Sequence, residues 1–127
     1  MNWYKTSQTN NPQVLNDDEM VGFILDHSLR DWSEKLDYNG AKEIAHASAQ
    51  WVLTELTLDF CNWTADPKYR NRAQNVPPIV LKTDKNEYDV LDGKHRIGMA
   101  KERGDKTIQV YLGVIWTGIK YHKKNMT

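Results

Sequence analysis

The sequence predicts a single mixed α+β domain in which helices pack on a small mixed sheet, and three observations support this fold class. Apolar and polar side chains alternate over residues 108–116, which is typical of a strand with one buried face. Apolar side chains recur at the helical period over residues 17–33, which indicates an amphipathic helix. The length of 127 residues suits one hydrophobic core, so we expect residues 1–127 to form a single domain.

The N-terminal part of the chain predicts two helices joined as a hairpin. Asn16 followed by Glu19 has the pattern of a capping box, so we expect the first helix over residues 17–33. Residues 38–40 form a predicted turn. Small apolar residues at helical spacing then predict the second helix over residues 41–52.

We interpret residues 1–52 as an N-terminal helical extension of a sheet that the rest of the chain forms. This extension either covers one face of the sheet or shapes access to a substrate. The strands of the sheet are predicted at residues 56–60, 78–82, 88–91 and 107–115. For the first of these strands, a continuing helix is the alternative. A further helix is expected over residues 94–103, and Gly104 stops it.

Charge is spread unevenly along the chain although the net charge is zero. Residues 1–66 hold four Lys/Arg against eleven Asp/Glu, and residues 67–127 hold thirteen against six, which gives −7 and +7. Either the C-terminal half binds anions, or the two halves neutralise each other in the fold.

Apolar runs are too short for a membrane span, the N-terminus lacks a signal core, and Cys61 is the sole cysteine. We therefore expect a cytoplasmic protein without disulfides.

The turn between residues 88–91 and the following helix carries the residues that suggest a chemistry. Free N–H groups at a helix N-terminus favour anions, and Gly93 lets a ligand approach the backbone. Lys94, His95 and Arg96 follow, and the planar guanidinium of Arg96 suits phosphate oxygens. His95 is also a candidate catalytic residue, because an imidazole moves protons near neutral pH.

Asp92 stands immediately before this turn, and three roles for its carboxylate stay open. It is a candidate catalytic base that takes a proton from an attacking hydroxyl group. It is also a candidate ligand of a Mg²⁺ ion that bridges phosphates. The third role is a turn-forming residue whose oxygen caps the next helix.

A pattern that extends beyond the turn adds to this interpretation. Its residues are Pro78, Ile79, Asp92, Gly93, His95 and Arg96. A Pro-Ile strand followed by Asp-Gly-x-His-Arg at a strand-to-helix turn resembles the ParB/sulfiredoxin superfamily, over about residues 56–114. The resemblance implies a ParB/sulfiredoxin-like fold that binds a nucleotide (ATP, ADP or CTP), with Mg²⁺ as a candidate cofactor. It further implies a small NTP-dependent phosphotransferase or phosphohydrolase. Because related serine kinases use an early carboxylate as base, Glu55 and Asp59 join Asp92 as candidates for that role.

Two departures from the family narrow what the resemblance implies. Lys94 stands where sulfiredoxins have their catalytic cysteine, and Cys61 lies on another segment, so sulfinic-acid reduction is not expected. The helical DNA-binding domain of ParB proteins is not expected either, and neither is centromere clamping. The alternative function is a non-catalytic DNA-binding, partner-binding or nuclease-like accessory protein of a phage or mobile element. Lys68, Arg70 and Arg72 would then grip nucleic acid, unless they form a solvated connecting segment.

Overall fold

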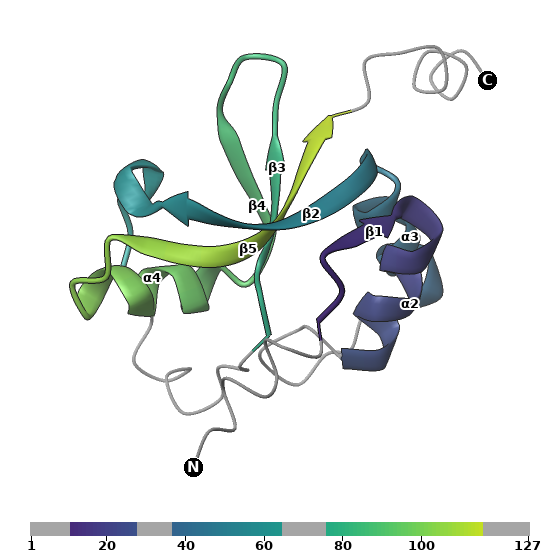
Figure 1. Cartoon of the computed structure of the whole chain (residues 1–127), viewed down its shortest axis with the longest axis horizontal. Coiled ribbons are helices and arrows are strands. Elements are labelled where there is room, and N and C mark those ends of the chain that lie inside the picture. Colours follow the sequence, from purple (N-terminus) through teal and green to yellow (C-terminus); the bar gives the residue numbers. More distant parts are fainter. Residues whose placement is uncertain (1–10, 28–36, 65–75, 116–127) are drawn as a thin grey trace.

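The fold is a five-stranded mixed sheet with helices on both of its faces (Figure 1). The computed structural model describes residues 11–27, 37–64 and 76–115. The strands are β1 (Val14–Asn16), β2 (Ser48–Thr57), β3 (Ile79–Lys82), β4 (Tyr88–Asp92) and β5 (Thr107–Ile115). They lie in the order β1-β2-β5-β3-β4, and β3 and β5 are parallel whereas the other neighbours are antiparallel. The predicted α+β class is confirmed.

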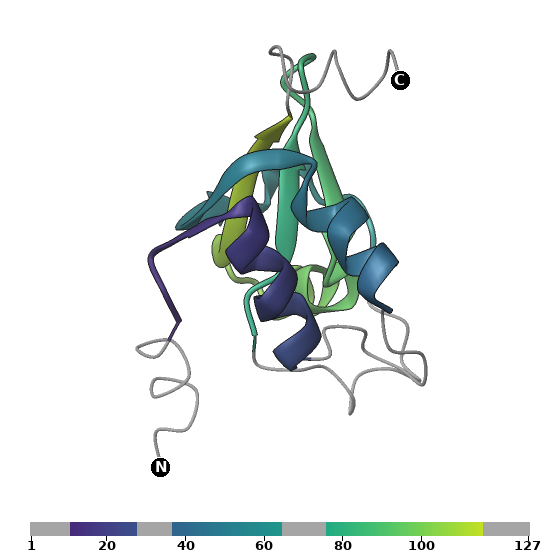
Figure 2. The ribbon, with the colours of Figure 1, turned by 90° about the vertical axis from the view of Figure 1, so that its right-hand side faces the viewer.

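Two hydrophobic clusters fill the two sides of the sheet, because successive strand residues point to opposite faces. The helices are α2 (Asp17–His27), α3 (Tyr38–Ala45) and α4 (Lys94–Glu102), and η1 (Leu58–Phe60) is a short 3₁₀ helix. The helices α2 and α3 pack with Ile79 and Tyr111 on one face, whereas α4 packs with Val80 and Val110 on the other. Figure 2 shows α2 and α3 side by side against the sheet. In the described ranges, no helix is long and apolar enough to span a membrane.

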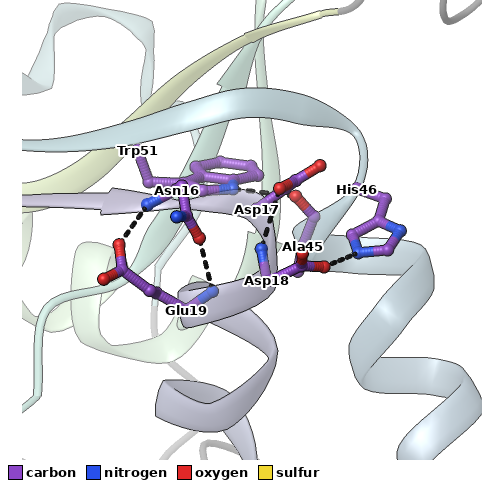
Figure 3. A network of polar contacts seen from close by, with 7 residues as sticks. All are labelled: Asn16, Asp17, Asp18, Glu19, Ala45, His46 and Trp51. Atoms are coloured by element: carbon purple, nitrogen blue, oxygen red, sulfur yellow. Dashed lines mark hydrogen bonds and ion pairs between the residues drawn. The ribbon is translucent and has the colours of Figure 1, made fainter.

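The predicted capping box at the start of α2 is confirmed. The backbone N–H of Glu19 donates to Asn16 Oδ1 at 2.7 Å, and the backbone N–H of Asn16 donates to Glu19 Oε1 at 2.8 Å (Figure 3). The helix is described as far as His27, so the predicted extension over residues 28–33 lies outside the described residues.

The second predicted helix is wrong in both of its boundaries. Asp37 caps α3 by accepting a hydrogen bond from the N–H of Gly40 at 2.7 Å, so residues 38–40 are its first turn rather than a loop. The helix ends at Ala45, and residues 48–52 belong to β2. Within the predicted helical extension over residues 1–52, residues 14–16 and 48–52 are strands of the sheet.

The reason for this error is the burial of one aromatic side chain. Trp51 is fully buried, and its indole N–H donates to the carbonyl of Ala45 at 2.9 Å (Figure 3). Trp51 lies opposite Gly113 in the β2–β5 register, and a Cβ at Gly113 would lie 2.6 Å from the Trp51 ring. The glycine makes room for the indole, and this distant pairing outweighs the local helical spacing.

The other strand predictions are largely confirmed. The structure has strands at residues 79–82, 88–92 and 107–115, close to the predicted bounds. The strand predicted at 56–60 is only half correct, because β2 ends at Thr57 and η1 follows. The helix predicted over residues 94–103 is confirmed, and Arg103 forms its C-cap. The short edge strand β1 was not predicted, since three residues are too few to show a period.

Candidate functional site

The turn between β4 and α4 has the predicted strand–glycine–helix form. The strand ends at Asp92, Gly93 occupies the N-cap position with φ 95°, and the helix begins at Lys94. A Cβ at Gly93 would lie 2.7 Å from the Cβ of Pro78 and 2.9 Å from Arg96 Nη2. Glycine is thus required both by the left-handed backbone and by the packing of Pro78 against it. The space beside its Cα is filled by protein.

Arg96 points into the protein rather than towards solvent. Its side chain is 7% exposed, its Nη1 donates to the carbonyl of Val76, and its Nη2 lies 3.5 Å from Asp92 Oδ2. The Asp92 side chain is equally buried. This arrangement holds together the end of β4, the start of α4 and the segment that enters β3. Arg96 therefore fixes the shape of the turn in this conformation.

Lys94 is the exposed basic residue of the turn, and a tryptophan that belongs to no sequence motif lies beside it. The Lys94 Nζ lies 5.1 Å from the centroid of the Trp63 ring, which is cation–π geometry. The Trp63 indole N–H donates to the Lys94 carbonyl at 3.0 Å. No local spacing pattern could have identified Trp63, because its partner is 31 residues away in the sequence.

The first turn of α4 combines backbone donors with basic side chains. Gly93 supplies no side-chain cap, and the first turn contains no acidic residue. The N-cap residue therefore offers no side-chain acceptor to the first backbone N–H groups of the helix. His95, the second residue of α4, is half-buried. Anionic groups are favoured at such an end by the helix dipole.

The structure constrains the three roles of Asp92. Its carboxylate faces the Arg96 guanidinium, so a Mg²⁺ ion there would have to compete with a cation that is already present. Gly93, not Asp92, occupies the N-cap position of α4. The other candidate bases lie elsewhere: Glu55 on β2 accepts a hydrogen bond from Thr107 Oγ1 at 2.6 Å, and Asp59 lies in η1.

The remaining predicted site residues lie outside the described part of the chain. Lys68, Arg70 and Arg72 fall within residues 65–75, for which no structure is described. Cys61 is buried and lies apart from the turn in sequence, immediately after η1.

Comparisons with family models, with curated proteins and with solved structures found no match to this chain.

Proposed function

We propose that the protein binds a phosphate-bearing ligand, a nucleotide such as ATP, ADP or CTP, at the N-terminus of α4. The observation that carries this proposal is a helix end without a side-chain cap that is lined by basic residues instead of acidic ones. Backbone N–H groups and the helix dipole supply an anion site, and the exposed ammonium of Lys94 adds a charge beside it.

Gly93 and the three basic residues that follow it take different roles in the proposed site. Gly93 sets the backbone conformation of the turn, and Lys94 and the first N–H groups of α4 contact phosphate oxygens. Arg96 acts as a positioning residue, because its guanidinium bonds to protein groups in this conformation. In the proposed phosphotransfer or phosphohydrolysis reaction, His95 moves the proton. A Mg²⁺ ion would be held by Asp92 and would supply neutralisation of phosphate charge. The resemblance to ParB-like proteins supports this reaction class.

Isothermal titration calorimetry with ATP, ADP, CTP and inorganic phosphate, with and without Mg²⁺, tests the proposal. Lys94→Ala is expected to weaken nucleotide binding about tenfold, because it removes a charge-assisted contact. Lys85→Ala is the matched control, since Lys85 is an exposed lysine in the turn between β3 and β4. Equal affinities of the wild type and both variants would show that the α4 end is not the binding site.

The alternative, a non-catalytic nucleic-acid-binding protein, gives a different salt dependence. Each phosphate that a protein neutralises on a nucleic acid releases counterions, so binding falls steeply as salt rises. A gel-shift titration in increasing salt, run beside a nucleotide hydrolysis assay, separates the two functions. Steep salt dependence with no hydrolysis, and with the largest losses in Lys68, Arg70 and Arg72 variants, would favour the alternative.

A further inference from the structure

We propose a second ligand site, for a small organic ammonium cation, at the other end of β4 from the phosphate site. A groove of about 510 Å³ lies between η1 and the turn that joins β3 to β4. The residues that line this η1 groove are Thr57, Asp59, Phe60, Asn86, Glu87 and Tyr88. Tyr88 is the first residue of β4 and Asp92 is the last, so the two sites occupy opposite ends of one strand. The volume is within the range of small-molecule sites.

The charge of the η1 groove selects a cation. Asp59 and Glu87 both line it, both are exposed, and none of the lining residues is basic. Among the described residues, neither carboxylate forms a hydrogen bond or an ion pair. Two carboxylates in one concave surface attract a positive ligand and disfavour a phosphate. A neighbouring hollow shares Asp59 and also contains Lys101 and Lys106, so Glu87 is the carboxylate that belongs to this groove alone.

The aromatic side chains of the groove favour an organic cation over a metal ion. The Phe60 and Tyr88 ring centroids are 5.3 Å apart and their planes are inclined at 50°, so the rings meet at an angle. Phe60 also makes an edge contact with Trp63 at 6.0 Å, and Trp63 carries the Lys94 ammonium over its ring. Trp63, which ends this row of three rings, thus already contacts one ammonium group, that of Lys94. Alkylated ammonium groups combine the charge and the apolar surface that suit such rings.

Calorimetry with choline and its neutral isostere 3,3-dimethyl-1-butanol tests this site in the full-length protein. These probes have nearly the same shape and differ in charge, so choline is expected to bind about fivefold more tightly. Equal affinity, or binding of neither compound at millimolar concentration, would overturn the proposal. The test is independent of the phosphate site, because neither probe carries a phosphate.

Matched variants locate the site. Glu87→Gln and Tyr88→Leu are each expected to weaken choline binding about two- to fivefold. Asp84→Asn removes the same charge as Glu87→Gln from the same turn but lies outside the groove, so it should leave the affinity unchanged. Thermal melting shows whether each variant is folded. Equal losses of choline affinity in the Asp84→Asn and Glu87→Gln variants would show that the overall charge of the protein causes the effect. That result would overturn the proposed site.

A third titration identifies the source of the ammonium group. A short peptide with a central trimethyllysine presents the same cation on a polypeptide backbone. If it binds more tightly than choline and loses that advantage in Tyr88→Leu, the ligand is a modified side chain of a partner protein. If choline and the peptide bind equally, the groove recognises a free small molecule.

Discussion

The N-terminal ends of α2 and α4 both follow a strand, but they differ in side-chain capping and in the charge of their first turns. The helix α2 begins directly after β1, and α4 begins after β4 with only Gly93 between them. At α2, Asn16 and Glu19 bond to each other's backbone N–H, and the first turn holds acidic residues only. At α4, Gly93 supplies no side chain and the first turn is basic. The chain itself provides the negative charge at α2, whereas the first turn of α4 holds no acidic residue.

The two ends also differ in what holds them in place. The end of α2 rests mainly on local hydrogen bonds between residues three positions apart, and one long-range contact joins His46 Nε2 to Asp18 Oδ1 at 3.2 Å (Figure 3). The end of α4 depends on long-range contacts, in which Arg96 reaches Val76 and Trp63 reaches Lys94. The α4 end is thus held by residues that lie far from it in the sequence.

Loss of the Arg96 side chain should therefore damage the α4 end more than any single change at the α2 end. Arg96→Ala is expected to lower the free energy of unfolding by about 3–5 kcal/mol, since it leaves the buried Asp92 carboxylate without this cation. Urea denaturation measures the loss. Arg103→Ala is the control, because its ion pair with Asp105 is exposed and should contribute less than about 1 kcal/mol. If both variants lose equally little, Arg96 does not hold the turn.

Replacing glycine by alanine should have opposite effects on stability at Gly93, beside α4, and at Gly22, in α2. Gly93→Ala is expected to cost roughly 2–4 kcal/mol, because alanine is strained at this φ and its Cβ meets Pro78. Gly22 lies within α2, and beyond its chain neighbours and the helix backbone nothing lies within 4 Å of the position that a Cβ would take there, so Gly22→Ala should stabilise the protein by about 0.5–1 kcal/mol. Thermal melts of the two variants should shift in opposite directions. A shift in the same direction would contradict the packing described for Gly93.

The smallest effect is expected at the cap of α2. Asn16→Ala should cost about 1 kcal/mol, since it removes the side-chain acceptor for the Glu19 N–H. Nucleotide affinity should be unchanged, because the α2 end takes no part in the proposed site. The same chemical denaturation and calorimetry experiments measure both quantities. A loss of nucleotide affinity in folded Asn16→Ala would mean that the two helix ends are not independent.

Features that depend on neighbouring residues could be predicted from the sequence, and features that depend on distant residues could not. The Asn16–Glu19 cap and the turn at Gly93 are set by a few consecutive side chains, and both predictions are confirmed. The start of β2 was missed because the burial of Trp51 requires Gly113 on another strand. The inward direction of Arg96 was missed for the same reason, since its acceptor on Val76 is 20 residues away.

The position of β5 in the sheet has a consequence for how the chain folds during synthesis. It lies between β2 and β3, so the two halves of the sheet meet only through residues 107–115. Before a ribosome has released these residues, the β1–β2 pair and the β3–β4 hairpin have no shared strand, and the edges of β2 and β3 that β5 will pair with are open. Long-range pairing of this kind slows folding and exposes nascent chains to aggregation. The nascent protein therefore depends on its last described strand to close the sheet.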